Sequence, residues 1–385
     1  MPPPCLPSRL PSVGTTIFTV MSRLANEHGA LNLSQGFPDF SPSSSLLERV
    51  THHMRNGANQ YPPMAGVAPL REAIAEKVER LYGARYDVES EITVTAGATQ
   101  ALFTAIAACV RPGDEVIVFA PVYDSYLPAI ALQGGTVKVI NLAPPAFRPD
   151  WTEVAAAITP RTRMIILNTP HNPTGTVWTA EDMAALARVV RDTDIVLLGD
   201  EVYEHIFYTG RHESLARTAE LRERSFVVSS FGKTYHITGW KIAYCLAPAA
   251  LTAEFRKVHQ FNVFTVHHPS QLGLADFMRA DPGFADGLAS FYRAKREFFR
   301  QQLEGSRFEL LPCDGTYFQL ARYDRINDMP DTEFARWLTI EKGVAVIPVS
   351  AFMPDGTDHG LVRFCFAKNE ATLTAAGAKL RSIRV

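Results

Sequence analysis

The sequence predicts an α/β protein, in which helices flank a mostly parallel sheet and a smaller α+β domain follows. Its 385 residues are too many for one simple core and favour a large domain with a smaller companion. From about residue 90, short apolar runs alternate with helical patterns. After about residue 275 this alternation gives way to a mixed pattern. These three observations together predict the fold class.

The strands expected in the large domain are short, continuous and apolar, which is typical of strands buried on both faces. They cover 91–95, 115–119, 136–140, 164–168, 195–198, 225–229 and 241–246. Helical patterns lie between them at 98–110, 124–133, 152–158 and 180–192. Because strands alternate with helices, we expect most of the strands to run parallel.

The C-terminal part begins with a long helical pattern at 284–303 and ends with a closing helix. Between them the sequence predicts strands at 308–311, 316–320, 344–347 and 361–366, and a helix at 331–342. We therefore expect three parts: an N-terminal segment that packs with the small domain, a large domain and a small domain, at 1–40, 41–275 and 276–385.

The composition is that of an ordinary globular protein, with 46% hydrophobic and 20% charged residues and a net charge of −2. This charge gives no general attraction to nucleic acid or anionic lipid. No apolar run approaches the roughly 18 residues of a membrane span. Five scattered cysteines without a CxxC pair argue against a disulfide framework or zinc site. We expect a cytoplasmic protein without a metal site and without nucleic-acid or membrane partners.

Small and polar residues follow the predicted strands, at the edge of the sheet where ligands bind in open parallel sheets. The first strand is followed by 96–99 (AGAT), where small residues open a helix whose N–H groups can face a phosphate. The later strands are followed by Tyr123, Asn172, Asp200, Tyr203, Ser230, Lys233 and Lys241. The sequence thus predicts one composite site.

These groups suit a flat cationic heterocycle that bears an aldehyde and a phosphate. The amine of Lys233 can form an imine with the aldehyde. A buried carboxylate from Asp200 would keep the ring nitrogen protonated and make the ring an electron sink. Further donors suit the ring hydroxyl and the phosphate, namely Asn172, Tyr203, Thr99, Ser230 and Lys241.

Four blocks resemble the signature blocks of the class I and II aminotransferases of fold type I: 168–175 (NTPHNPTG), 200–204 (DEVYE), 229–240 (SSFGKTYHITGW) and 363–368 (RFCFAK). The blocks 34–40 (SQGFPDF) and 59–61 (NQY) are similar to the branch of kynurenine aminotransferases and glutamine transaminase K. Within that branch, 14–18 (GTTIF) and FGKTYH resemble bacterial methionine aminotransferases. The resemblance extends over residues 10–385.

The resemblance implies pyridoxal 5′-phosphate as the cofactor and a homodimer as the assembly. It implies that Lys233, Asp200 and Tyr203 are catalytic. It assigns cofactor contacts to Ala98, Thr99, Tyr123, Asn172, Asp200, Tyr203, Ser230, Lys233 and Lys241, with Tyr61 reaching the neighbouring subunit. It assigns substrate contacts to Phe18, Gly36, Asn172, Arg363 and Phe264, the last from the partner subunit.

The expected reaction moves the amino group of a large neutral amino acid to a 2-oxo acid. Methionine is the first choice, followed by glutamine and aromatic amino acids. The alternative on the same site is kynurenine–oxoglutarate transamination or β-lyase activity on cysteine S-conjugates. Two positions depart from the family: Gly232 replaces a frequent serine, and Thr265 stands where kynurenine-using relatives tend to have histidine.

Other interpretations of the same residues explain less of the pattern. The run Gly232-Lys233-Thr234 mimics the end of a P-loop, but Val227 occupies the position of the required glycine. Asp200 and Glu201 alone would also fit a Mg²⁺-binding pair. A non-catalytic regulator on this fold normally carries a DNA-binding domain, for which 385 residues leave no room.

Overall fold

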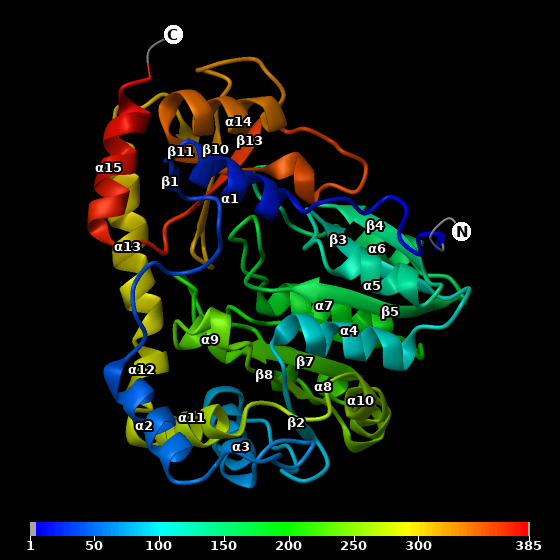
Figure 1. Cartoon of the computed structure of the whole chain (residues 1–385). Helices are drawn as coiled ribbons and strands as arrows, with labels where there is room; N and C mark the ends of the chain where they lie inside the picture. The colour runs from blue at the N-terminus through cyan, green and yellow to red at the C-terminus, as the bar shows by residue number, and fades with distance from the viewer. Residues whose placement is uncertain (1–4, 384–385) are drawn as a thin grey trace.

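The computed structural model describes residues 5–383 and is built around a seven-stranded sheet (Figure 1). The strand order is β2-β8-β7-β6-β5-β3-β4, and only β8 runs antiparallel to its neighbours. The predicted mostly parallel sheet is thereby confirmed. Its strands are β2 (Ile92–Thr95), β3 (Glu115–Ala120), β4 (Thr136–Asn141), β5 (Thr162–Asn168), β6 (Val196–Asp200), β7 (Ser225–Ser230) and β8 (Ala243–Leu246).

Helices cover both faces of this sheet, because successive side chains of a strand point to opposite faces. In β5, Ile165 and Leu167 belong to one apolar cluster, and Met164 and Ile166 belong to another. One cluster also holds α4 (Ala98–Cys109), α5 (Tyr126–Leu132) and α10 (Ala249–Asn262). The other holds α3 (Ala68–Tyr82), α6 (Trp151–Ala157), α7 (Ala180–Val190), α8 (Ala219–Arg222) and α11 (His268–Ala280).

A second, antiparallel sheet has the order β12-β13-β10-β9 and a third apolar cluster. Its strands are β9 (Glu309–Leu310), β10 (Phe318–Arg322), β12 (Ile347–Pro348) and β13 (Leu361–Cys365). Helices α13 (Leu288–Gln302) and α15 (Glu370–Arg381) lie together along one side of the molecule, and α14 (Asp331–Lys342) lies at the top in Figure 1.

Two elements of this part differ from the prediction. The expected helix at 284–303 is interrupted at Gly287, between α12 (Gly283–Asp286) and α13, because glycine is a poor helix former. The expected strand at 344–347 is two strands that serve different sheets. Its first half, β11 (Val344–Ala345), pairs with the N-terminal segment, and its second half, β12, pairs with β13.

The N-terminal segment packs against the C-terminal part of the chain. Its strand β1 (Leu31–Asn32) runs parallel to β11, and its helix α1 (Ile17–Glu27) packs against α14. The chain then crosses to α2 (Ser44–Arg55), which packs against α11 beside the large sheet. The boundaries expected after residues 40 and 275 stay a prediction.

Within residues 5–383, no helix has both the length and the apolar character to cross a membrane. The same residues contain no group of three or more His, Cys, Asp or Glu side chains that could hold a metal ion. All five cysteines are free thiols, and Cys245, Cys313 and Cys365 are buried.

The contact between α2 and α11 predicts the effect of adding one methyl group. A Cβ on Gly273 would lie 2.4 Å from Val50 Cγ2 and 2.9 Å from the Val50 backbone nitrogen. Alanine is normally better than glycine inside a helix by about 1 kcal/mol. Here Gly273→Ala should instead destabilise the protein by about 1–3 kcal/mol, because two backbones must separate. Urea unfolding measures this change.

A matched control is Gly283→Ala, where the nearest atom to the new Cβ would be 3.7 Å away. This variant should keep the stability of the parent protein. A Gly273→Ala protein as stable as its parent would contradict the close helix contact.

Candidate active site

A cavity of about 320 Å³ opens at the carboxyl ends of β5, β6 and β7, between the large sheet and β13. Its size lies in the range of small-molecule sites. The structure brings most of the predicted site residues to this one cavity. Those that line it are Phe18, Gly36, Ala98, Thr99, Tyr123, Asn172, Asp200, Tyr203, Ser230, Lys233, Lys241 and Arg363.

Lys233 lies on α9 (Phe231–Thr234), a single helical turn that begins directly after β7. Its Nζ donates hydrogen bonds to the Gly36 carbonyl oxygen (3.1 Å) and to Tyr317 Oη (2.9 Å). Burial lowers the pKa of Lys233 to about 8. A large share of the amine is therefore neutral near pH 8, in the form that reacts with a carbonyl carbon.

Asp200 is the last residue of β6 and is buried, with 4% of its surface exposed. One carboxylate oxygen, Oδ2, accepts a hydrogen bond of 2.5 Å from Tyr126 Oη, whereas Oδ1 has no partner. Burial raises the pKa of Asp200 to about 6. A buried carboxylate oxygen without a donor is costly. It therefore fits a ligand that presents a cationic N–H group, as a protonated pyridine nitrogen does.

Another group of lining residues is suited to an anion. Gly97 caps the N-terminus of α4 with φ +81°, and a Cβ there would lie 3.1 Å from Lys241 Nζ. A cation beside the positive end of a helix is unfavourable unless an anion binds between them, which is what a phosphate would do. Thr99 and Ser230 line the same cavity. A Cβ at Gly232 would lie 3.2 Å from Ser230 Oγ, so glycine also avoids crowding there.

Arg363 enters the cavity from β13 and is buried, with 1% of its surface exposed. Its guanidinium donates to Asn172 Oδ1 (2.7 Å) and to the Ser34 carbonyl oxygen (2.9 Å), and its Nε has no partner. Burial lowers the pKa of Arg363 to about 10, so the group stays charged near neutral pH. Its partners are neutral oxygens, so this buried cation is suited to the carboxylate of a ligand.

Aromatic rings surround this guanidinium. Its central carbon lies 3.9 Å from the ring centroid of Phe318, 5.2 Å from that of Phe352 and 5.4 Å from that of Phe18. Tyr123 and Tyr203 line the same cavity, and burial raises the pKa of Tyr123 to about 12. Both the cation–π contacts and the apolar walls favour a ligand with a carboxylate and an uncharged side chain.

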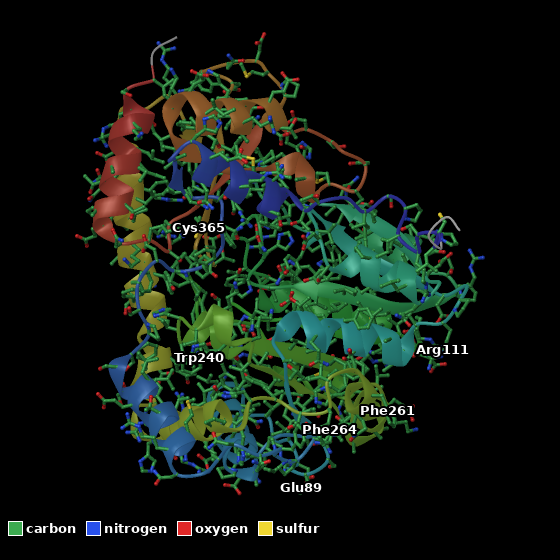
Figure 2. The ribbon with its side chains drawn as sticks, in the orientation of Figure 1. Glu89, Arg111, Trp240, Phe261, Phe264 and Cys365 are labelled. Carbon is green, nitrogen blue, oxygen red and sulfur yellow. The ribbon has the colours of Figure 1, made fainter. Side chains whose placement is uncertain are left out.

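Two predicted site residues lie outside the cavity. Tyr61 is 81% exposed and Phe264 is 39% exposed, and their rings meet edge to face at 5.4 Å. Phe261, labelled with Phe264 in Figure 2, lies nearby on the same side of the molecule and is 90% exposed. Their expected contribution to a neighbouring subunit stays a prediction.

The sequence did not identify two tyrosines that touch the central groups. Tyr126 donates to Asp200, and Tyr317 bonds to Lys233. Tyr126 is the first residue of α5, and its ring meets that of Tyr123 edge to face at 5.7 Å, so its closeness to a predicted site residue in the sequence was the available signal. No local pattern marks Tyr317, because its contact with Lys233 joins segments 84 residues apart.

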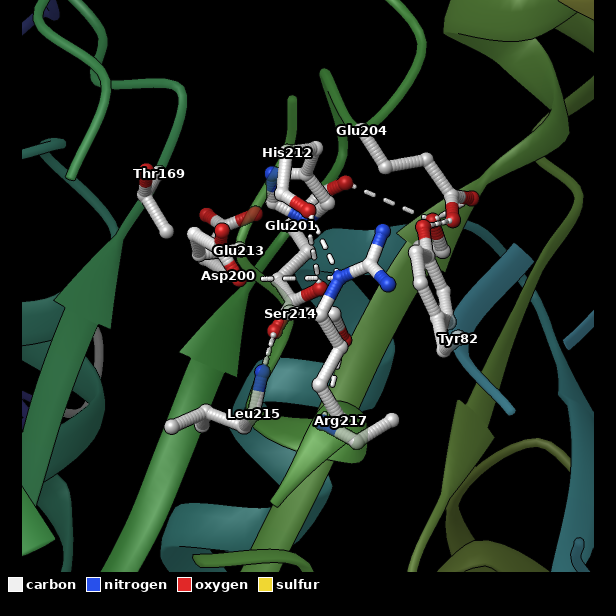
Figure 3. Close-up of polar contacts among 12 residues, drawn as sticks. Tyr82, Thr169, Asp200, Glu201, Glu204, His212, Glu213, Ser214, Leu215 and Arg217 are labelled. Atoms are coloured by element: carbon white, nitrogen blue, oxygen red, sulfur yellow. Dashed lines mark hydrogen bonds and ion pairs between the residues drawn. The ribbon is translucent and has the colours of Figure 1, made fainter. Parts of the chain in front are cut away.

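A buried polar network holds the segment after β6 in place (Figure 3). Glu201 accepts hydrogen bonds from His212 Nε2 (2.7 Å) and from the Leu215 backbone nitrogen (2.9 Å). Glu204 pairs with Lys77 at 2.5 Å. Burial opposes the ionisation of Glu204, but the ammonium of Lys77 outweighs it and holds the pKa of Glu204 well below its usual range. Both carboxylate oxygens of Glu201 therefore have hydrogen-bond partners within the protein.

Comparison with known proteins identifies relatives over nearly the full chain. Residues 29–380 match the model of the family aminotransferase class I and II. The chain is 56% identical to methionine aminotransferase of Escherichia coli K12 over 99% of both chains. It is 33% identical to human kynurenine–oxoglutarate transaminase 1 over 98% of both. The crystal structure of YbdL from Escherichia coli, identified as a methionine aminotransferase, superposes with a TM-score of 0.96, 56% identity, and coverage of 98% of this chain and 100% of that one.

The burial of Asp200 predicts a pH-dependent effect on stability. Its pKa in the folded protein, about 6, lies above the ordinary value of 3.8. The folded state thus binds more protons than the unfolded chain between these values, and stability falls as pH rises through this window. In cofactor-free protein, Asp200→Asn should therefore raise the free energy of unfolding by about 1–3 kcal/mol at pH 8.

At pH 4 the gain from Asp200→Asn should largely disappear, because the aspartic acid is then protonated in the folded protein. Urea unfolding at both pH values measures the difference. An equal effect of the substitution at pH 4 and pH 8 would show that the charge of Asp200 is not responsible.

Proposed function

Because the chain belongs to the class I and II aminotransferases, we propose that it moves the amino group of methionine and similar large neutral amino acids to a 2-oxo acid. The predicted family, fold type and transaminase activity are confirmed by these comparisons. The observation that carries the proposal is the meeting of Lys233, Asp200 and Arg363 in one cavity. Asp200 and Arg363 are buried and Lys233 is partly buried, and none of the three has an opposite charge bound to it.

The residues present fit pyridoxal 5′-phosphate. Asp200 Oδ1 is free to face a protonated ring nitrogen, and Lys241 beside the N-terminus of α4 suits the phosphate. When bound, this cofactor supplies an aldehyde for amine exchange and an electron-withdrawing ring. The other cofactor contacts that we propose are Tyr123 on the ring face, Asn172 and Tyr203 at the ring oxygen, and Ala98, Thr99 and Ser230 at the phosphate.

The protein's own part in the reaction is orientation and proton transfer. The planar guanidinium of Arg363 binds the α-carboxylate of the amino acid, with the Gly36 backbone N–H as a further donor. This contact fixes the α-carbon in the cavity next to Lys233. The neutral amine of Lys233 then accepts the α-proton and would donate it to the carbon that carried the cofactor's aldehyde, a role for which a pKa of about 8 is well matched.

The choice of substrate follows from the basic residues that line the cavity. Among residues 5–383 these are Lys233, Lys241 and Arg363, and each has a proposed partner already. No basic side chain remains for a second carboxylate, and Phe18 and Phe318 provide apolar walls. A 56% identical relative is a methionine aminotransferase, which supports methionine ahead of glutamine and aromatic amino acids.

A homodimer is part of this proposal. Tyr61 and Phe264 expose aromatic rings that would be covered, and used, at the site of a second copy. A cytoplasmic location is also proposed, on the ground that all five cysteines are free thiols.

Kynurenine transamination and β-elimination from cysteine S-conjugates are the second candidate activity on this site. The human kynurenine–oxoglutarate transaminase at 33% identity favours it. Thr265, whose hydroxyl donates to the Pro62 carbonyl oxygen at 3.2 Å, stands against kynurenine as the preferred substrate. Release of pyruvate, ammonia and a thiol would reveal elimination, whereas amino transfer converts the donor to its 2-oxo acid and the acceptor to an amino acid, without free ammonia.

Removal of the reactive amine tests the proposal. Lys233→Ala should lose the absorbance of covalently bound pyridoxal 5′-phosphate and lower kcat by at least about 1000-fold, because proton transfer loses its carrier. Lys257→Ala, which changes a lysine on the surface of α10, is the matched control and should keep both. Normal turnover in Lys233→Ala would exclude this assignment.

A panel of amino acids tests the substrate preference. With a common 2-oxo acid, methionine should show a kcat/KM at least about 100-fold above that of aspartate, because a second carboxylate would be buried without a partner. Leucine, glutamine and phenylalanine serve as uncharged comparisons and should fall between the two. A comparable rate with aspartate would mean that another basic residue, such as one from a partner subunit, reaches the pocket.

A further inference from the structure

Tyr317 contacts the reactive amine but has no part in the roles assigned above. Its hydroxyl accepts a hydrogen bond from Lys233 Nζ (2.9 Å) and donates one to the Gly36 carbonyl oxygen (2.6 Å). The same carbonyl oxygen accepts a second hydrogen bond from Lys233 Nζ (3.1 Å). The three groups form a closed triangle of hydrogen bonds around the end of the lysine.

Tight packing holds the side chain of Tyr317 in place. Its side chain is fully buried, and its ring packs against those of Tyr203, Tyr292 and Phe318 at 4.9–5.5 Å. Gly36 lines the cavity, whereas Tyr317 does not. The hydroxyl of Tyr317 therefore approaches the amine from the wall behind it.

The residue before Tyr317 has a strained backbone conformation. Thr316 has φ +63°, a left-handed conformation that is rare for a β-branched residue. It is held there by the hydrogen bond from its backbone nitrogen to the Ile206 carbonyl oxygen (2.8 Å) and by the hydroxyl of Tyr208, which donates to its carbonyl. Strained residues that the surroundings hold in this way are concentrated at functional sites.

We propose that Tyr317 is a positioning residue that, together with the Gly36 carbonyl, holds the free amine of Lys233 and directs its lone pair into the cavity. A neutral amine has two N–H bonds and one lone pair. With Tyr317 Oη and the Gly36 carbonyl oxygen as acceptors, both N–H bonds are used. The lone pair, which takes up the α-proton, is then left facing the substrate. This inference rests on the proposed function of Lys233.

The proposal predicts a shift in the titration of Lys233. A protonated amine donates a stronger hydrogen bond than a neutral one, so loss of the tyrosine oxygen should penalise the charged form and lower the pKa of Lys233 further. The other ionisable groups that act on this amine are Asp200 from β6, Arg363 and Cys365 from β13, and Lys241. Tyr317→Phe replaces none of these four side chains.

Two matched variants test it. Tyr317→Phe keeps the packed ring and removes only the hydroxyl. Tyr292→Phe removes a hydroxyl that is equally buried, that has no hydrogen-bond partner, and whose ring lies 5.5 Å from the ring of Tyr317. The pKa of Lys233 is measured in cofactor-free protein by acetic anhydride labelling between pH 6 and 10, with the Lys233 peptide quantified by mass spectrometry. The kcat and KM for methionine are measured in the loaded enzyme.

Tyr317→Phe should lower the labelling pKa of Lys233 and reduce kcat by about 3- to 10-fold, the worth of one hydrogen bond, with KM nearly unchanged. Tyr292→Phe should change neither. Wild-type values in Tyr317→Phe, or equal changes in both variants, would overturn the proposal. If the wild-type protein binds no pyridoxal 5′-phosphate at Lys233, the proposed function fails, while the labelling pKa still tests the hydrogen bond on its own.

Discussion

The site depends on one constraint, the parallel register of β5, β6 and β7. Asn168 and Asp200 are paired across two of these strands, and Asp200 is paired with Val228 of the third. The carboxyl ends of parallel strands lie at one edge of the sheet, so the loops that follow these strands meet there. This register also fixes the position of Lys233, which lies five residues after Val228. A slip of one residue would turn Asp200 to the opposite face of the sheet.

Several charged side chains at this edge have no oppositely charged partner within the protein. Asp200 keeps an unpaired oxygen, Arg363 contacts only neutral oxygens through its bonded nitrogens, and Lys241 lies beside the positive end of α4. The first two arrangements cost free energy because Asp200 and Arg363 are buried, whereas Lys241 is exposed. The neighbouring Glu204–Lys77 pair shows the contrast, since there the protein completes the pair itself. The incomplete charges are therefore best explained by bound molecules that together carry one cationic and two anionic groups.

The sequence predicted the part of this site that local patterns encode. Asp200, Asn172 and Lys233 each follow an apolar strand, and strand ends are readable from hydrophobic runs. Tyr317 could not be predicted, because its role arises from a contact between the small sheet and α9. The division of 344–347 into two strands was missed for a similar reason. Val344 and Ile347 are both apolar, and only the arrangement of β1 and β13 decides that they pair with different partners.

The large and the small sheet each contribute part of the site, and two hydrogen bonds join these parts at the places where a substrate would bind. Arg363 reaches across from β13 to Asn172, and Tyr317 reaches across to Lys233. An amino acid carboxylate would compete with Asn172 for the guanidinium, and its α-proton would approach the amine that Tyr317 holds. A ligand with both groups thus replaces one contact between the sheets and uses the other. Substrate recognition and the position of the proton carrier are then coupled, because Tyr317 directly precedes β10 and Arg363 lies in β13, and these two strands are hydrogen-bonded neighbours.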